Sequence, residues 1–441
     1  MTESLGGSWN AGVFLDAEDT DGYVRALPEE HGSIDVPSSY RSLNLQVKTE
    51  SRGSSGSRFF VKGNVLDHDL SQGTALATTH RRMYDVSAGG RFLLGGSEVS
   101  ATAFYQDASY DVDSTQLVPG AGRNQEYLAN RGRNPGEDVG GSLQWSRGLD
   151  GILTFLTAGL DVHRAFSHDR LVTFDRFGTQ TGTRTNEGHQ TFGGLFAEAS
   201  LLPAPRLEVL ASARLDSWQN AGGREESSAT GVRTYEDQGT TRLDPRLSLR
   251  WQLGDDVALR GAVYRGFRAP TLKELYRTAV TKTTVVLSNA ALGPETLVGG
   301  DLGVDFSAGL FRGQLNVFLN QIDGLIARET LATTPTLVVQ PRNLGAARSR
   351  GVEVMGTFAL ARALSLDAGY AFTDSVVTDN PANPGLVGNQ IPDVSRHAGS
   401  VELTWAPVPG PSVSFRGRAL SRRYADDSNQ SAMDPHLVLD L

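Results

Sequence analysis

The segment Arg206-Leu-Glu-Val-Leu-Ala-Ser-Ala-Arg-Leu-Asp-Ser-Trp218 decides the fold, because apolar and polar side chains alternate along it. Apolar side chains recur at Leu207, Val209, Ala211, Ala213 and Leu215. Polar side chains recur between them at Glu208, Ser212, Arg214 and Asp216. A period of two is that of a β-strand, whose successive side chains point to opposite faces. The segment therefore predicts a strand with one apolar face and one polar face.

The same alternation recurs along the whole chain. It is clearest in Arg246–Leu253 and Arg312–Asn320, where Phe318 is the one exception. Further copies are Leu43–Lys48, Arg58–Val65, Val257–Phe267, Val401–Trp405 and Ser412–Ala419. Apolar stripes with helical spacing are not sustained over any long window, and Arg268–Arg277 is the best short helical candidate. The sequence therefore predicts an all-β protein.

Short and long connections alternate between the predicted strands. Short turns are expected at Gly53–Ser57, Leu94–Ser97, Gly148–Gly151, Leu202–Pro205, Gly254–Asp256, Ala308–Arg312, Ala361–Leu364 and Pro407–Pro411. Long polar loops are expected at Ala17–Tyr40, Gln106–Glu137, Ser167–Gln190, Gln219–Thr241, Arg268–Thr296 and Asp374–Arg396. The short turns recur at intervals of roughly 40 to 55 residues. Eight hairpins, a strand before them (about Ser8–Leu15) and one after them (His436–Leu441) make about 18 strands.

This order predicts a transmembrane antiparallel up-and-down β-barrel. In such a barrel the short turns lie at one end and the long loops at the other. The barrel must close, because lipid cannot satisfy the backbone groups of an open strand edge. Polar faces rich in Arg, Gln, Asn and Glu would then line a wide lumen. Aromatic residues near strand ends would form girdles or pack as ordinary strand residues; they are Trp145, Trp218, Trp251, Tyr264 and Trp405.

Composition narrows the function classes. Hydrophobic residues make up 39% and charged residues 21% of the 441 residues, and no window holds about 18 consecutive apolar residues, which excludes a helical membrane protein. The absence of cysteine excludes disulfides and thiolate metal sites. A net charge of −9 gives no support to nucleic-acid binding. The first residues, Met1–Leu5, do not read as a signal peptide, so we expect either a cytoplasmic chain or a true N-terminus further upstream.

Three other classes of protein fit parts of the pattern. A soluble kelch-like β-propeller binding module has a period near 50, but its blades need four short strands and recurring diglycines. A large β-sandwich or adhesin is the second alternative. The third is an outer-membrane enzyme, but the chain has no G-x-S-x-G, H-E-x-x-H or phosphate-binding glycine motif. We therefore expect no enzymatic activity and no cofactor.

Several stretches resemble the barrel of TonB-dependent outer-membrane receptors. The most specific is Tyr264-Arg-Gly-Phe-Arg-Ala-Pro-Thr-Leu-Lys-Glu-Leu-Tyr-Arg277. The next, Asn289–Thr296, resembles the family's N-P-x-L-K-P-E-T but has Ala290 and Gly293 where the family has Pro and Lys. Others follow in the family's order at Thr20–Tyr23, Asn316–Ile326, Ser349–Val354, Gly369–Asp374 and Ile391–His397. The resemblance covers Asp244–His397 tightly and the rest of the chain loosely.

The resemblance implies a receptor in the outer membrane of a Gram-negative-type bacterium. Such receptors have about 22 strands around an N-terminal plug, so we expect residues 1–441 to be a partial barrel, with the plug and the last strands outside it. The family binds a scarce nutrient, such as a siderophore-iron complex, a corrinoid or an oligosaccharide. The inner-membrane TonB complex energises uptake through the plug. We expect a monomer in the lipid bilayer, and a passive porin is the nearest alternative.

Two groups of residues are candidates for binding. Arg265, Arg268 and Arg277 could attract an anionic ligand from the lumen, although the simpler interpretation is that they pair with Glu274 and Glu295. Asp111 and Asp113, beside Tyr110, could bind calcium in an outer loop, although two solvated acids are the simpler interpretation.

Overall fold

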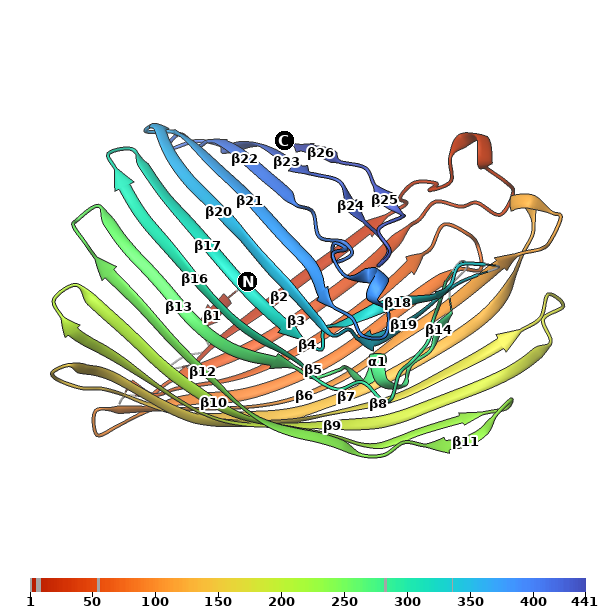
Figure 1. Cartoon of the computed structure of the whole chain (residues 1–441), viewed down its shortest axis with the longest axis horizontal. Coiled ribbons are helices and arrows are strands. Elements are labelled where there is room, and N and C mark those ends of the chain that lie inside the picture. Colours follow the sequence, from red (N-terminus) through yellow and green to blue (C-terminus); the bar gives the residue numbers. More distant parts are fainter. Residues whose placement is uncertain (1, 5–8, 54–55, 281–283, 335) are drawn as a thin grey trace.

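One long, curved antiparallel sheet forms nearly all of the protein. The computed structural model describes residues 2–4, 9–53, 56–280, 284–334 and 336–441. The sheet contains twenty strands, of which β1 (Thr2–Ser4) and β11 (Gly231–Thr234) are short attachments, which leaves eighteen in the wall. Its strands bend around a wide interior, with the short hairpin turns at one end of the molecule (Figure 1). The predicted fold class and strand number are therefore confirmed.

The wall strands follow one another in chain order, each antiparallel to the next. The first half comprises β2 (Trp9–Thr20), β3 (Tyr40–Arg52), β4 (Arg58–Ser71), β5 (Thr78–Leu94), β6 (Ser97–Leu117), β7 (Glu126–Gly148), β8 (Leu153–Phe174), β9 (Gln180–Ala204) and β10 (Leu207–Ser227). The second half comprises β12 (Gln238–Gln252), β13 (Val257–Arg268), β16 (Glu295–Ala308), β17 (Phe311–Asp323), β20 (Ala346–Ala361), β21 (Leu364–Asp379), β22 (His397–Trp405), β23 (Val413–Leu420) and β26 (His436–Asp440).

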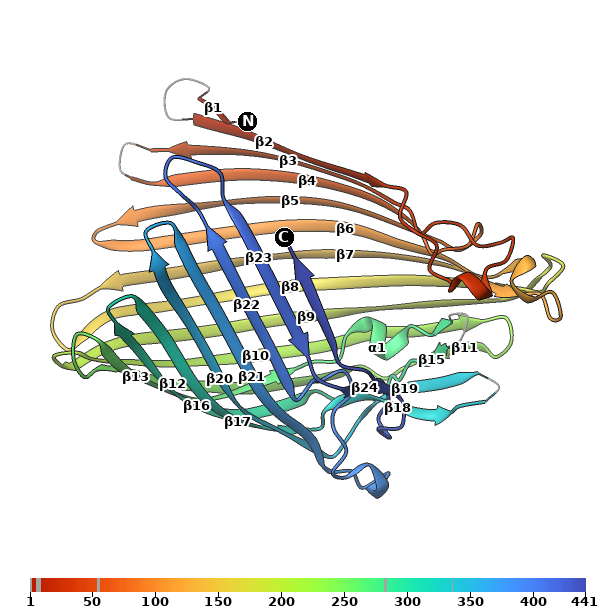
Figure 2. The same ribbon diagram turned by 90° about the horizontal axis from the view of Figure 1, so that it is seen from above.

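The remaining elements lie in the long connections. A small sheet contains β14 (Ala279–Val280), β15 (Thr284–Val286), β19 (Leu337–Asn343) and β18 (Ile326–Ala332), and β24 (Arg423–Tyr424) pairs with β25 (Ala432–Met433). The helices are α1 (Leu272–Tyr276) and the 3-10 turns η1 (Pro28–Glu30), η2 (Gly122–Asn124) and η3 (Pro384–Leu386). Figure 2 shows α1 and the small sheet at the end away from the short turns. None of the helices in the described residues is long and apolar enough to span a membrane.

All eight predicted short turns join consecutive wall strands. In the first of them, residues 54 and 55 lie outside the described part of the chain, as do residues 1 and 5–8, which include the start of the strand predicted at about Ser8–Leu15. The predicted loop Arg268–Thr296 matches the connection between β13 and β16, but several other long loops were predicted too long. The predicted loop Gln106–Glu137 is mostly strand, and only residues 118–125 connect β6 to β7. Polar residues extend the pairing of β6 with β7 beyond the apolar positions, because cross-strand ion pairs such as Arg131–Asp113 (3.0 Å) join the two strands.

Alternation along each strand identifies the outer face of the wall. Exposed apolar side chains, such as Val61 and Val65 of β4, share one face, and polar ones such as Lys62 share the other. Trp145, Trp251 and Trp405 lie on the apolar face near the short turns, as a girdle requires. The other two aromatics of the expected girdle face the interior: Trp218 is 1% exposed, and Tyr264 donates a hydrogen bond to Asn320.

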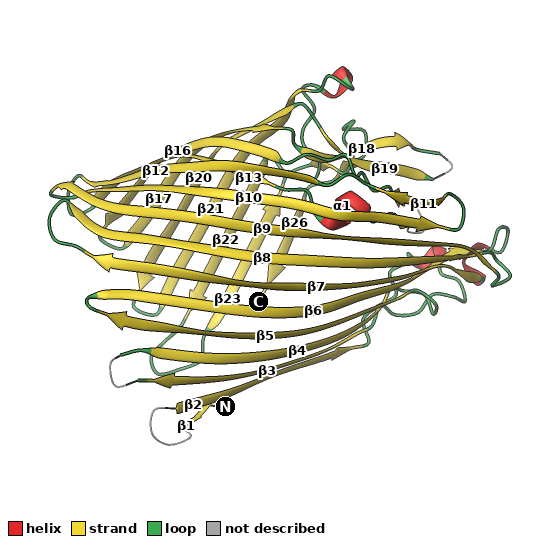
Figure 3. Cartoon of the chain, turned by 90° about the horizontal axis from the view of Figure 1, so that it is seen from below, coloured by secondary structure: helices red, strands yellow, loops and turns green. Residues whose placement is uncertain are grey.

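The wall is not closed within the described residues. At one edge β26 pairs with β23, and at the other β2 pairs with β3 and with the short β1. No ladder between described residues joins β26 to β1 or β2. Figure 3 shows the strands curving around the interior from one edge to the other, with α1 inside the curve. The interior is a lumen open to solvent, and a buried hydrophobic cluster of the described residues lies in the loops that enter it.

A candidate binding chamber in the lumen

The connection between β13 and β16 folds into the lumen and carries the one α-helix of the described residues. Thr271 caps α1: its hydroxyl accepts a hydrogen bond from the Glu274 backbone N–H, and the Glu274 carboxylate accepts one from the Thr271 backbone N–H. The preceding residue, Pro270, anchors the segment because its carbonyl accepts a hydrogen bond from Gln190 on the lumen face of β9 (2.7 Å). The sequence expectation of a short helix within Arg268–Arg277 is confirmed.

Tyr276 holds this segment against the wall. Its hydroxyl oxygen accepts a hydrogen bond from the Asn220 side-chain amide (2.5 Å), and burial raises the pKa of the phenol. Two glycines of the wall make room for the ring. A Cβ on Gly188 would lie 2.7 Å from the ring, and one on Gly223 would overlap the hydroxyl. Leu275 and Leu292 are fully buried beside the ring, so α1 stands on a small core of its own.

Arg268 joins both ends of the inward segment. Its guanidinium lies 2.6 Å from the Glu295 carboxylate and 3.1 Å from that of Glu274. Burial alone would raise the pKa of Glu274, but hydrogen bonds from the Thr271 backbone and from Arg268 outweigh it and lower that pKa. The other Glu295 oxygen accepts a hydrogen bond from the Ile326 backbone N–H (2.7 Å). Arg268 therefore pairs with the acids named by the simpler interpretation, and its role is to hold the loop.

A cavity of about 300 Å³ lies between α1 and the lumen faces of β6 to β9. The side chains used below come from four wall strands and from the end of α1: Tyr110, Asn130, Asp169, Asn186, Lys273 and Arg277. Three of them are buried polar groups, because Asn130 is 6% exposed, Asp169 7% and Asn186 4%. The Oδ1 atom of Asn186 has no hydrogen-bond partner among the described residues. A buried, unpaired polar atom is costly, so the cavity favours an occupant that can donate a hydrogen bond.

Two cationic side chains stand at the rim of this chamber. Burial and the neighbouring Arg277 lower the pKa of the Lys273 ammonium group. Arg277 lies over the Tyr110 ring, with its guanidinium carbon 5.7 Å from the ring centroid. Within the described residues neither cation makes an ion pair at salt-bridge distance, although most arginines on the wall do. The chamber can therefore accept an anionic group without breaking an existing pair.

The structure does not gather the predicted arginines into one site. Arg277 borders the chamber, whereas Arg268 is tied to its two glutamates. Arg265 lies two residues from the exposed Val263 on β13, and therefore shares its outward face. The site residues missed by sequence reasoning are Asn130, Asp169 and Asn186. The sequence signal that could have identified these three residues is their position on the lumen-facing, polar side of strands that extend beyond the band of alternating apolar residues.

The aspartates proposed as calcium ligands lie on a strand and not in a loop. Asp111 and Asp113 are part of β6, on its outward face, and arginines of β7 occupy their oxygens. Arg133 lies 3.5 Å from Asp111 and 3.1 Å from Asp113, and Arg131 lies 3.0 Å from Asp113. Calcium binding at this pair stays a prediction, and the ion would have to displace both arginines.

Comparisons with known proteins agree with this architecture. The family model "TonB dependent receptor-like, beta-barrel" matches residues 14–441. Among curated proteins, the iron-regulated outer membrane virulence protein of Vibrio cholerae serotype O1 is 22% identical over 265 residues, which span 56% of this chain and 37% of that protein. The chain therefore matches little more than a third of that relative's length.

Solved structures share the fold. The ferric yersiniabactin uptake receptor FyuA of Yersinia pestis superposes with a TM-score of 0.77 at 14% identity, covering 99% of this chain and 67% of that one. The siderophore receptor PiuA of Acinetobacter baumannii gives 0.78 at 12% identity, covering 99% and 71%. These matches and the Vibrio relative indicate the outer membrane of a Gram-negative bacterium as the location. By the match over residues 14–441 and the shared architecture, the chain belongs to the TonB-dependent receptor-like β-barrel family.

Proposed function

We propose that this chain forms the wall and part of the ligand site of a receptor that takes up a small anionic nutrient complex. The observation that carries the proposal is the chamber: Lys273 and Arg277 make no ion pair with any described residue, and they lie beside the Asn186 amide oxygen, which has no hydrogen-bond partner among the same residues. Two solved structures that share the fold are named as receptors of ferric yersiniabactin and of a siderophore. The anionic groups of a ferric chelate fit the two cations, and a hydroxyl or amide N–H on the chelate could donate to the Asn186 oxygen.

The other nutrient classes fit the chamber less well. An uncharged oligosaccharide would leave the two cations at the rim without a partner. A corrinoid is large and mostly neutral, so only a polar arm of it would meet the two cations. A passive pore would not need an inward loop held by Arg268 and Tyr276 across its lumen.

Binding is tested on the full-length receptor in detergent, by titration calorimetry with ferric citrate as the anionic probe and a neutral ferric trihydroxamate as the comparison. We expect Lys273→Gln and Arg277→Gln each to weaken ferric citrate binding about tenfold, since a hydrogen bond to a charged group contributes about 1.5–3 kcal/mol. Arg312→Gln is the matched control, because Arg312 lies near the short turns in a separate cavity. Equal binding of the neutral chelate, or unchanged affinity in both variants, would contradict an anion site.

Energy coupling is a separate part of the proposal. We propose that the intact receptor works as a monomer without enzymatic activity, and that the inner-membrane TonB complex drives release of the ligand into the periplasm. Cells that carry the receptor should accumulate radioactive iron from ferric citrate only when TonB is present. Equal accumulation in cells without TonB would point to the passive pore.

A further inference from the structure

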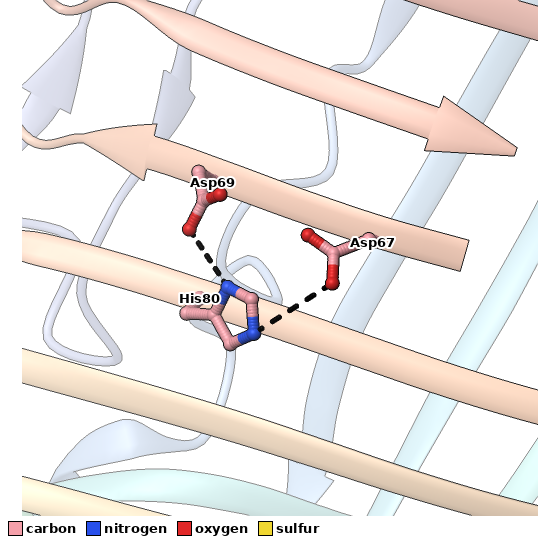
Figure 4. A group of neighbouring side chains, drawn as sticks. All are labelled: Asp67, Asp69 and His80. Atoms are coloured by element: carbon pink, nitrogen blue, oxygen red, sulfur yellow. Dashed lines mark hydrogen bonds and ion pairs between the residues drawn. The ribbon is translucent and has the colours of Figure 1, made fainter. Parts of the chain in front are cut away.

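Two carboxylates and an imidazole meet on neighbouring strands of the wall, on the opposite face of the sheet from the chamber. Asp67 and Asp69 belong to β4 and His80 to β5, where Asp69 lies directly opposite His80 (Figure 4). The Nδ1 atom of His80 is 2.7 Å from an Asp69 oxygen, and its Nε2 atom is 4.0 Å from an Asp67 oxygen. The ligand atoms that the three residues offer all lie within 4.8 Å of one another. We call these three residues the outer triad.

The outer triad points away from the lumen. Along β4, Asp67 and Asp69 continue the face of Val61 and Val65, and along β5, His80 continues the face of Tyr84 and Val86. These apolar side chains form the lipid-facing band, in which Leu15, Leu45, Val65 and Tyr84 lie in one cross-strand row. The triad therefore stands outside the wall, just beyond the band on the side of the long loops. The sheet itself separates it from the proposed transport path.

The neighbours of the triad explain why a cation fits there. At its height a single row of outward residues crosses six strands in register: Asp19, Arg41, Asp69, His80, Asp111 and Arg133. Acids and arginines alternate along this row except at one position. His80 stands between Asp69 and Asp111, where the alternation calls for a third arginine. Arg41 is already paired with Asp19 at 3.3 Å, so Asp69 has only His80 as a cationic partner among the described residues.

We propose that the outer triad binds one divalent transition-metal ion of the zinc type. Imidazole nitrogen and carboxylate oxygen are both ligands that zinc accepts, and three protein ligands leave the fourth position of a tetrahedral site open. The ion takes the place of the hydrogen between His80 and Asp69 and supplies the positive charge that the row lacks at this point. A calcium or magnesium ion fits less well, because both prefer oxygen ligands alone. The open coordination position faces outward, toward the polar headgroups of the membrane.

Arg82 is the competitor of the metal. Its guanidinium lies 3.1 Å from the same Asp67 carboxylate, directly across the ladder, so the ion must displace it to gain its third ligand. Because Arg82 competes with the metal, the direction of the change in zinc affinity distinguishes a competitor from a ligand. Removing Arg82 raises the affinity if Asp67 is a ligand, whereas removing a ligand lowers it.

Zinc titration of the full chain in detergent micelles tests the proposal, with calorimetry for affinity and cobalt absorption spectra for the ligand set. We expect one zinc ion per chain, a loss of at least tenfold in affinity in His80→Asn and Asp69→Asn, and a gain in Arg82→Gln. In the cobalt form, His80→Asn should lose the visible bands of a nitrogen-ligated ion. Heat-modified gel mobility establishes that each variant is folded.

The matched control is His68→Asn, because His68 is on β4 between the two aspartates but faces the lumen beside Tyr40. It should bind zinc like the parent. The proposal is overturned if the parent chain does not bind zinc, if calcium binds as tightly as zinc, or if His68→Asn loses as much affinity as His80→Asn. None of these outcomes depends on ferric citrate binding, so the experiment tests the zinc site of the outer triad independently of the anion site in the chamber.

Discussion

Arg123 forms an ion pair with Asp35, although eighty-eight positions separate the two residues in the sequence. The Arg123 Nε atom donates to both Asp35 carboxylate oxygens, at 3.1 and 2.9 Å, and the side chain of Asp35 is only 3% exposed. Asp35 lies in the connection between β2 and β3, and Arg123 lies in η2 between β6 and β7. The hydrogen bond from Arg123 holds the pKa of Asp35 at about 2, well below its ordinary 3.8. This pair docks one long loop on another.

Arg123→Gln should release the loop at residues 21–39. The lowered pKa of Asp35, of which the Arg123 hydrogen bond is the largest cause, corresponds to about 2 kcal/mol in all, so trypsin should cleave after Arg25 about tenfold faster in the variant. The control is Arg176→Gln, which removes an exposed loop arginine that stacks on Phe177. If cleavage at Arg25 is equally slow in all three proteins, the clamp does not hold this loop.

The same pair predicts a dependence on pH. Because the pKa of Asp35 is lowered in the folded protein, its stabilisation is complete above about pH 4 and is lost as the pH falls toward 2. The protection factors of the backbone amides of residues 32–36, which are corrected for the pH dependence of intrinsic exchange, should therefore fall between pH 4 and pH 2 in the parent. In Arg123→Gln these protection factors should be low over the whole range, and a parallel response in both proteins would remove Asp35 as the cause.

Gly188→Ala should displace α1 from the wall. The new Cβ would lie 2.7 Å from the Tyr276 ring, which is buried and cannot turn away. We expect faster trypsin cleavage after Lys273 and Arg277 and weaker ferric citrate binding. Gly266→Ala adds the same methyl group where no atom lies within 4 Å and should behave like the parent. Intact binding in Gly188→Ala would show that the chamber does not require Tyr276 in this position.

Arg268 and Glu274 should be coupled in a double-mutant cycle. Arg268→Gln leaves two part-buried glutamates without their cation, so the loop should loosen more than in Glu274→Gln alone. Because the Arg268 side chain is 41% exposed, we expect a coupling energy of only about 0.5–1 kcal/mol. Loop opening measured by amide exchange gives the four values of the cycle, and simple additivity would exclude a direct pairing.

Ligand binding should weaken at alkaline pH. Burial and Arg277 lower the pKa of Lys273 below its ordinary 10.5, so this side chain loses its charge earlier than a free lysine as the pH rises. Ferric citrate affinity should fall through that range in the parent. In Lys273→Arg the charge persists and the fall should disappear. A fall of the same size in Lys273→Arg would assign it to another group.

Sequence patterns sufficed for the wall because each rule acts locally. Alternation at Arg206–Trp218 requires a strand, and a short polar break such as Leu94–Ser97 requires a turn. The strand lengths were underestimated because beyond the apolar band both faces are polar, as at Asp113 of β6. Alternation no longer marks a strand there, and only cross-strand partners such as Arg131 reveal it.

The chamber was harder to predict than the wall. Asn130, Asp169 and Asn186 come from three strands, and their proximity depends on the register of each ladder, which one sequence does not specify. Arg277 could be nominated because it lies in a segment with family resemblance, but its separation from Arg268 depends on how the loop turns into the lumen. The small sheet of β14, β15, β18 and β19 was missed because its strands are short and pair across long sequence gaps.

The row from Asp19 to Arg133 also fixes how deep the barrel can sit. Drawing such charges into hydrocarbon costs about 2–4 kcal/mol for each Arg at the midplane. A slip of one residue in any ladder would turn its member of the row toward the lumen and an inward residue toward lipid. On the side of β2 to β7, this row of charges therefore limits how deeply the barrel can enter the bilayer and how far it can tilt. The row forms only when each of those strands has paired in the correct register.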